Sequence, residues 1–172
     1  MNEHNLLVYP LNGIEMMKLN PTAKLITYDQ LNKVYNIDDL FKDTDKIIIL
    51  YLLRSRQEGH WVCLFKNKEG YNFFDSYGHK PDYEIDCLTE IQRRDFHEKK
   101  HKLHQLLKNK DVVYNNIKLQ GKASMVCGCY VSHRLNNSNL TEDEYINKFI
   151  KYNITHPDKF VAQYCLNRLN KA

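Results

Sequence analysis

Four residues of the sequence have the types that nucleophilic acyl transfer by a thiol requires: His60, Asp75, Gln120 and Cys127. Such chemistry needs a thiol that ionises readily, a base that accepts its proton, and a group that orients the base. It also needs donors for the oxyanion that forms on the attacked carbonyl group. Each of the four residues can fill one of these roles, provided that the fold brings them together.

Cys127 is the candidate nucleophile, because it lies where an irregular loop is expected to pass into a helix. The N-terminus of a helix favours a thiolate through the helix dipole and its free N–H groups. Gly128, the next residue, would leave room for a substrate backbone to approach. A small buried core cysteine has the same local sequence, so Cys127 alone does not identify a nucleophile.

His60 and Asp75 are the candidate base and orienting group. His60 begins one expected strand and Asp75 ends the next, so an antiparallel pair would place the two side chains next to each other. The carboxylate would then hold one ring nitrogen and leave the other to face the thiol. Taken singly, His60 also fits an edge histidine bonded to a carbonyl group, and Asp75 also fits a turn-initiating residue.

Gln120 is the candidate oxyanion donor and lies seven positions before Cys127. Its side-chain amide could act together with the backbone N–H of Cys127. The residues around it are small and polar, which is equally typical of a solvated loop.

These residues must be positioned by a small sheet with helices before and after it, which is an α+β domain. The apolar run Ile47–Leu53 predicts a fully buried strand, and Gly59–Phe65 and Tyr71–Phe74 predict a hairpin. The stretch up to about Asn20 is expected to be irregular. The remaining expected elements are one or two short helices over 28–41, a helix over 88–108, a short strand over 112–114, a helix over 127–135, a helix opened by a capping box at Thr141, and a last helix capped around Thr155, Pro157 and Asp158.

The order His, Asp, Gln, Cys resembles the adenovirus-type protease group, which includes the ubiquitin-like-protein (SUMO) proteases. The interval of seven from Gln120 to Cys127 is more similar to adenovirus protease than to the SUMO proteases. Several stretches resemble the maturation proteases of virophages and related Polinton-type elements. These stretches are 28–32, 37–40, 59–65, 73–78 and 119–120, whereas about the last 30 residues match no part of that pattern.

The resemblance implies a single cysteine protease domain over residues 1–172 with the adenain-type fold. It implies an endopeptidase that trims capsid precursors after small residues at Gly-rich sites, in the virion and the cytoplasmic virus factory. Trp61 and Gly128 would then border the substrate groove. One feature departs from adenovirus protease: no cysteine stands just before Val112, where the disulfide to an activating peptide would fall.

Composition is consistent with a protein that works in a reducing compartment without a membrane. The five cysteines are an odd number without a secreted-type spacing, which predicts free thiols. The segment MNEHNLLVYP lacks the apolar centre of a signal peptide, and no apolar run has transmembrane length. No metal and no other cofactor is expected.

Other function classes remain open on the sequence. His97–His101 has the HExxH pattern of zinc proteases, with His104 one turn further, although lysines and arginines crowd the segment. The basic segment 93–110 could make weak contacts with DNA or RNA. The pair Cys127 and Cys129 with His133 could form a metal or redox site, although the spacing fits no common zinc knuckle.

Two further alternatives keep the fold and change the role. An isopeptidase that releases ubiquitin or SUMO tails would use the same four residues on a different substrate. A non-catalytic virion protein could also retain the fold, although such a copy would be free to lose any of the four residues.

Overall fold

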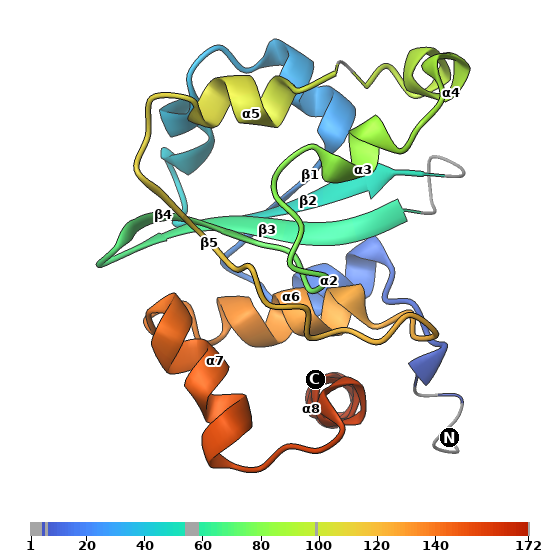
Figure 1. The fold of residues 1–172 in the computed structure, drawn as a ribbon, viewed down its shortest axis with the longest axis vertical. Helices are drawn as coiled ribbons and strands as arrows, with labels where there is room; N and C mark the ends of the chain where they lie inside the picture. Colours follow the sequence, from blue (N-terminus) through green and yellow to red (C-terminus); the bar gives the residue numbers. More distant parts are fainter. Residues whose placement is uncertain (1–4, 6, 54–58, 99, 172) are drawn as a thin grey trace.

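A mixed five-stranded sheet forms the centre of the molecule (Figure 1). The computed structural model describes residues 5, 7–53, 59–98 and 100–171. The strands lie side by side in chain order, and the inner three are antiparallel while each edge strand runs parallel to its neighbour. They are β1 (Lys24–Thr27), β2 (Lys46–Leu52), β3 (Gly59–Asn67), β4 (Gly70–Phe74) and β5 (Val112–Tyr114). The expected α+β class, with a small mixed sheet flanked by helices, is confirmed.

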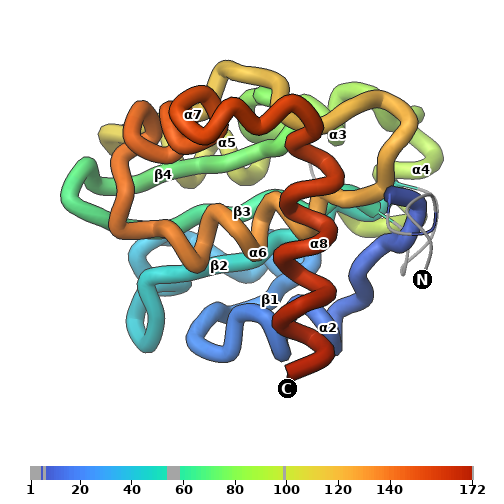
Figure 2. The backbone as a smooth tube through the Cα atoms, turned by 90° about the horizontal axis from the view of Figure 1, so that it is seen from below, coloured from blue at the N-terminus to red at the C-terminus, as the bar shows by residue number. Residues whose placement is uncertain are grey.

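Helices cover both faces of this sheet (Figure 1). On one face lie α2 (Gly13–Leu19), α6 (Cys127–Leu135), α7 (Glu142–Lys151) and α8 (Pro157–Leu169). On the other face lie the 3-10 helices η1 (Tyr28–Lys33) and η2 (Ile37–Phe41) with α3 (Tyr83–Asp86), α4 (Glu90–Asp95) and α5 (Lys102–Leu107). Helix α6 packs against β3 on one side and α8 on the other, and Figure 2 shows α8 crossing it. Among the described residues, none of the helices is long and apolar enough to cross a membrane.

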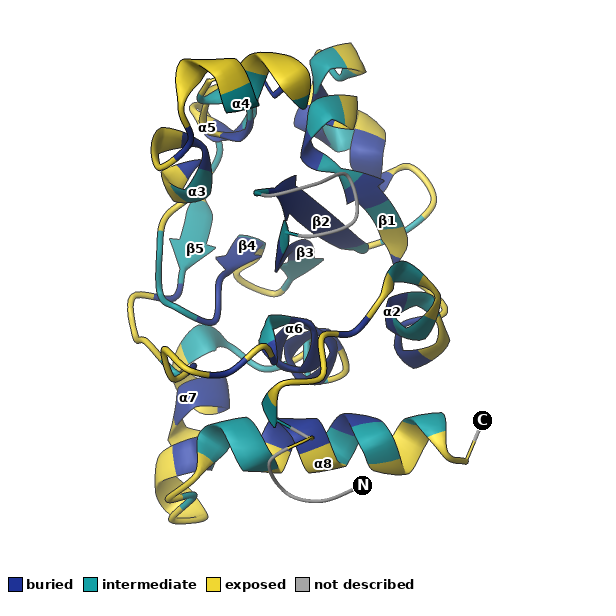
Figure 3. Cartoon of the chain, turned by 90° about the vertical axis from the view of Figure 1, so that its right-hand side faces the viewer, coloured by how far each residue is buried: buried dark blue, intermediate teal, exposed yellow. Residues whose placement is uncertain are grey.

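Alternate residues of β2, β3 and β4 enter two separate hydrophobic cores. In β2, Ile48, Leu50 and Leu52 face the core that contains α6, whereas Ile47 and Ile49 face the core of η1 and η2. Side chains of a strand alternate between the two faces, so a strand covered on both faces must be apolar at every position. This explains the continuous apolar run in the sequence, since β2 is buried at every position after Lys46 (Figure 3).

The hairpin between β3 and β4 forms as predicted. Gly70 closes it with a φ of +94°, a conformation that favours glycine. The side-chain oxygen of Asn67 accepts a hydrogen bond from the Glu69 N–H at 2.9 Å, which stabilises the turn. This hairpin fixes the register that carries His60 and Asp75.

The single helix expected over 88–108 is wrong, because the chain forms α4 and α5 with a break between them. His97 and His101 both have a positive φ there, which a helix excludes. Tertiary contacts account for the break: the Glu98 carboxylate accepts a hydrogen bond from the Leu52 N–H, and the Asn32 amide donates to the His97 carbonyl. Lys99, part of the expected helix, lies outside the described residues.

Two further expectations are corrected at the ends of the chain. The stretch before Asn20 contains the helix α2, which Asn12 and Glu15 open with a capping box. Helix α8 begins after His156 without a side-chain cap, so Thr155 does not cap it, although Pro157 occupies the expected first turn. The capping box of Thr141 at the start of α7 is confirmed.

Candidate active site

His60 and Asp75 meet at the end of the sheet where β3 begins and β4 ends. The His60 Nε2 atom lies 2.9 Å from the Asp75 Oδ1 atom, and the two residues are 5% and 1% exposed. The pairing of the two strands ends with Cys63 opposite Phe74, so the chain after β4 passes beside the start of β3. The antiparallel arrangement therefore brings the two side chains together as the sequence predicts.

Asp75 is held rigidly by its surroundings. Its Oδ1 atom also accepts a hydrogen bond from the Tyr77 N–H at 2.8 Å. Asn115, the residue after β5, uses its side-chain amide to bond both the N–H and the C=O of Asp75, at 2.9 and 2.5 Å. The Asn115 side chain thus extends the sheet by one rung of hydrogen bonds at the position that orients the histidine.

Cys127 is the first residue of α6 and is half-buried. No side chain caps this helix at Val126, so the N–H groups of the first turn are not occupied by a capping side chain. An uncapped helix N-terminus attracts negative charge. The local geometry is therefore suited to a thiolate and to an oxyanion beside it.

His60 lies between the carboxylate and the thiol. Burial lowers the pKa of His60, but the charge and hydrogen bond of Asp75, followed by the hydrogen bond and charge of Cys127, outweigh burial. The pKa of His60 is therefore raised well above its usual value of 6.5. Since Nε2 is bonded to Asp75, the nitrogen left for Cys127 is Nδ1. Both partners therefore favour the charged imidazolium form of His60.

Gln120 is buried, at 2% exposure, in the loop that leads to α6. Its Oε1 atom accepts a hydrogen bond from the Ser76 hydroxyl at 2.6 Å, and its Nε2 atom donates to the Ser124 carbonyl at 2.9 Å. Within a side-chain amide the NH2 group donates and the oxygen accepts, so these two contacts fix the orientation of the Gln120 amide. One amide hydrogen is used by Ser124, and the role of Gln120 as an oxyanion donor stays a prediction.

Trp61 and Gly128 contact each other in the core between β3 and α6. Trp61 is 6% exposed, and its Nε1–H donates to the Leu11 carbonyl at 3.0 Å. A Cβ atom on Gly128 would lie 2.9 Å from the Met16 sulfur and 3.1 Å from Trp61. Glycine at this position therefore allows α6 to dock closely on the sheet, and a substrate-binding role for either residue stays a prediction.

Three neighbours of the site were given no role in it from the sequence. Tyr77 stacks on the His60 ring, with 5.2 Å between centroids and an interplanar angle of 26°. Ser76 fixes Gln120, and Asn115 fixes Asp75. Ser76 and Tyr77 directly follow Asp75 in the sequence, which was the available signal. Asn115 has none, because it acts on the backbone of a distant segment.

The possible metal ligands lie at this same place. Among the described residues, one group could hold a metal ion: His60, Asp75 and Glu84, whose ligand atoms lie within 4.8 Å of one another. A metal there would compete with the bond between His60 and Asp75. The HExxH pattern does not form a helical face, since His97 and His101 both interrupt the helix and His101 bonds Asp86 at 2.9 Å. Lys99, inside the pattern, is not among those described.

Cys129 and His133 make hydrogen bonds to different partners. Cys129 is buried, and its carbonyl accepts a hydrogen bond from the Cys165 thiol. His133 bonds the Tyr145 hydroxyl at 2.9 Å. Nothing in these contacts joins the pair into a metal or redox site with Cys127.

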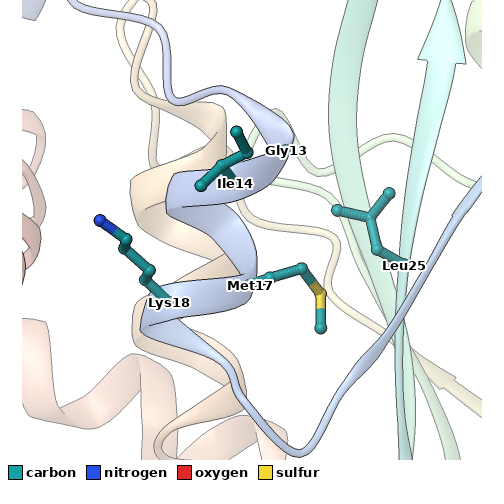
Figure 4. Close-up of a pocket in the computed structure, with 5 residues that line it drawn as sticks. All are labelled: Gly13, Ile14, Met17, Lys18 and Leu25. Atoms are coloured by element: carbon teal, nitrogen blue, oxygen red, sulfur yellow. The ribbon is translucent and has the colours of Figure 1, made fainter.

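Two other surface features carry none of the four residues. A shallow hollow is lined mainly by apolar side chains of α2 and β1, and it offers no pair of groups for proton transfer (Figure 4). Its lining residues are Gly13, Ile14, Met17, Lys18 and Leu25.

The basic segment 93–110 uses part of its charge within the protein. Arg93 donates to the Ile85 and Leu88 carbonyls, and Lys110 pairs with Asp38.

Comparison with known proteins identifies a viral relative of similar length. No family model matches the chain. The uncharacterized protein V9 of Sputnik virophage is 28% identical over 153 residues, which span 84% of this chain and 86% of the relative.

Solved structures show weak similarity over nearly the whole chain. The central domain of the uncharacterized Lpg1148 protein of Legionella pneumophila has a TM-score of 0.43 at 14% identity, covering 94% of this chain and 98% of that one. ChlaDub1 of Chlamydia trachomatis has a TM-score of 0.39 at 12% identity, covering 95% and 93%. The SUMO protease Ulp1, with its catalytic cysteine oxidized to a sulfonic acid, has a TM-score of 0.36 at 16% identity, covering 89% and 72%. Because all three TM-scores are below 0.5, function has to be argued from the side chains.

Proposed function

We propose that the protein is a cysteine endopeptidase with Cys127 as nucleophile, His60 as general base and acid, and Asp75 as orienting residue. The observation that carries the proposal is the buried chain of contacts from Asp75 through His60 to Cys127 at an uncapped helix N-terminus. Core histidines rarely combine a buried carboxylate on one side with a thiol on the other, and this combination is what activates a thiol.

In the first half of the reaction, the Cys127 sulfur attacks the carbonyl carbon of the scissile peptide bond and forms a C–S bond. The carbonyl oxygen becomes an oxyanion that accepts hydrogen bonds from the Cys127 backbone N–H and the free amide hydrogen of Gln120. The His60 imidazolium then gives its proton to the leaving nitrogen, and the C–N bond breaks. This leaves a thioester between Cys127 and the N-terminal fragment.

In the second half, water attacks the thioester carbonyl carbon and His60 accepts the proton of that water. The C–S bond breaks, which releases the carboxylic acid and regenerates the thiolate beside the imidazolium. Asp75 keeps the ring in position throughout. No metal or redox group is needed in either half.

The proposed substrates are capsid precursors cut after small residues, with Gly favoured just before the scissile bond. The resemblance to virophage maturation proteases and the similarity to a virophage protein support a viral substrate. The Tyr77 ring supports the preference for small residues, because it stacks on His60. A ring stacked on His60 limits the room for a bulky side chain beside that histidine, which is the physical basis of this preference.

The second candidate function is an isopeptidase that releases ubiquitin-like tails ending in Gly-Gly, since a narrow site would accept such tails as well. A tail-processing enzyme needs a broad surface for a folded ubiquitin-like domain, whereas a maturation protease needs only an extended peptide. Two further predictions belong to the same proposal. One is weak contact with DNA through the segment 93–110, and the other is activity in the virion and the virus factory.

The decisive experiment co-expresses the chain with the capsid genes of its own virus and follows trimming by mass spectrometry. Trimming should occur with the wild type and with Cys129→Ala, and it should disappear with Cys127→Ala. Loss of activity in Cys129→Ala alone would overturn the assignment of the nucleophile. A peptide library run beside ubiquitin and SUMO conjugates separates the two candidates: release of the folded modifier without cutting of capsid peptides would favour the isopeptidase.

A further inference from the structure

The loop around Gln120 is fastened to the C-terminal helix by a carboxylate. The two Asp158 oxygens lie 3.2 and 3.1 Å from the Gly121 N–H, and Gly121 directly follows Gln120. The Tyr130 hydroxyl lies 2.7 Å from the Asp158 Oδ1 atom and 3.1 Å from the Leu119 carbonyl oxygen. The backbone on both sides of Gln120 is therefore in contact with one small cluster, formed by Tyr130 of α6 and Asp158 of α8.

The fit between the loop and this carboxylate is close. A Cβ atom on Gly121 would lie 2.9 Å from the Asp158 Oδ2 atom, so with a larger residue either the loop or the carboxylate would have to shift. Burial raises the pKa of Tyr130, and so do its hydrogen bond to Asp158 and the charge of Asp158. The Tyr130 hydroxyl therefore keeps its proton and can donate it in a hydrogen bond. Hydrogen bonds to an ionised acceptor are stronger than neutral ones.

Gln120 depends on such support because no regular element carries it. The chain between β5 and α6 forms no helix or strand. The Gln120 N–H bonds the Ser76 carbonyl at 3.0 Å and the side chain bonds Ser76 and Ser124, but all of these partners lie in loops themselves. Asp158 lies in the first turn of a helix, so it offers the loop a partner on a regular element.

We propose that Asp158 is a positioning residue of the active site: it ties the Gln120 loop to α8 and thereby holds the Gln120 amide at the oxyanion. The proposal rests on the peptidase function proposed above. It makes α8 part of the catalytic apparatus, although this helix lies in the region of the sequence that matches none of the resembled motifs. A donor displaced by about 1 Å costs on the order of 100-fold in rate.

The test separates oxyanion stabilisation from activation of the thiol. In Asp158→Ala, kcat for a peptide substrate should fall about 10- to 100-fold while KM changes little. The rate at which iodoacetamide alkylates Cys127 should stay at the wild-type value, because alkylation forms no oxyanion. Asp158→Asn keeps one acceptor oxygen, so its kcat should lie between the values of the wild type and Asp158→Ala. Asp143→Ala, which removes an exposed carboxylate from the first turn of α7, is the matched control and should leave every rate unchanged.

A second measurement does not depend on activity. Hydrogen exchange at the Gly121 N–H, followed by NMR, should be faster in Asp158→Ala than in the wild type, with no change in Asp143→Ala. Unchanged exchange would overturn the proposal even if the chain proved not to be a peptidase. Wild-type kcat in Asp158→Ala, or an equal fall in kcat and in alkylation rate, would also overturn it, whereas failure of the wild type to cut any peptide would instead reject the proposed function.

Discussion

Two buried histidines of this protein show how surroundings decide the charge of the same side chain. His60 lies beside the N-terminal end of α6, and His133 lies near the C-terminal end of that helix. Both are 5% exposed. Burial is the largest influence on each and lowers both pKa values, yet the pKa of His60 is raised well above 6.5 while that of His133 is lowered to about 4.

The difference lies in the partners. His60 has the Asp75 carboxylate and the Cys127 thiol, which favour the imidazolium. His133 bonds a neutral hydroxyl and is surrounded by aromatic rings, and the charges of Lys148 and Arg134 lower its pKa further. The rings belong to Tyr145, Phe149, Phe160 and Tyr164. One histidine is thus prepared for proton transfer and the other serves as a neutral core residue.

Replacing each histidine should give the largest contrast. His60→Ala should lower kcat/KM by about 1000-fold or more, since the thiol loses its base and the leaving group its acid. His133→Phe should leave kcat/KM within about threefold, because no catalytic proton passes through the aromatic cluster. Both are measured with a peptide substrate at a temperature where circular dichroism shows folded protein. Full activity in His60→Ala would refute the mechanism.

Removing the charge beside His60 should have a smaller effect. Asp75→Asn should lower kcat about 10- to 100-fold, because the pair of His60 and Cys127 survives with weaker orientation. The Asp75 charge raises the pKa of His60, so its loss lets the imidazolium give up its proton at lower pH. The alkaline limb of the pH profile of kcat/KM should therefore move to lower pH. An unmoved alkaline limb would show that the carboxylate does not set the charge of His60.

The lowered pKa of His133 should make the stability of the folded protein depend on pH. The folded protein holds the pKa of His133 at about 4, whereas an unfolded histidine titrates near 6.5, so the unfolded chain binds more protons between these values. Stability should therefore fall as pH decreases through this window, by about 2 kcal/mol between pH 7 and pH 5 from this group. Urea unfolding at both pH values should show this fall reduced in His133→Phe. Equal pH dependence in both proteins would contradict it.

The smallest expected effect is that of a chelator. The mechanism needs no metal, although His60, Asp75 and Glu84 could gather around one. EDTA should leave the peptidase rate unchanged, with a zinc-dependent peptidase assayed beside it as positive control. Inhibition that added zinc reverses would show that His60 serves as a ligand and not as a base.

The parts of the fold that were predicted from sequence are those with a local cause. Alternating faces and continuous apolar runs predicted β2, β3 and β4, and Thr141 with Glu144 predicted the start of α7. The same kind of local signal, Asn12 with Glu15, marks the start of α2. The break between α4 and α5 has no local cause, because Glu98 turns inward to bond Leu52, which is 46 positions away.

The residues of the site also divide into those that the sequence indicates and those that it does not. The four proposed catalytic residues were chosen because their types and order are tied to the chemistry. The structure places Asp75 beside His60 and Gln120 beside Ser76, while the catalytic roles stay predictions. Asn115 and Asp158 were not found as parts of the site, since each holds a backbone group of a distant segment. Many residue types can accept or donate such a bond, so sequence alone gives little sign of it.

The contact of Gly128 with Trp61 has a consequence for the newly made chain. His60 and Asp75 belong to one hairpin and can meet early, but Cys127 reaches them only when α6 docks on β3 through this contact. Contacts between distant segments form late in folding, since closing a long loop costs entropy. During synthesis Cys127 has no imidazole beside it, so His60 and Cys127 come together only in the finished tertiary structure.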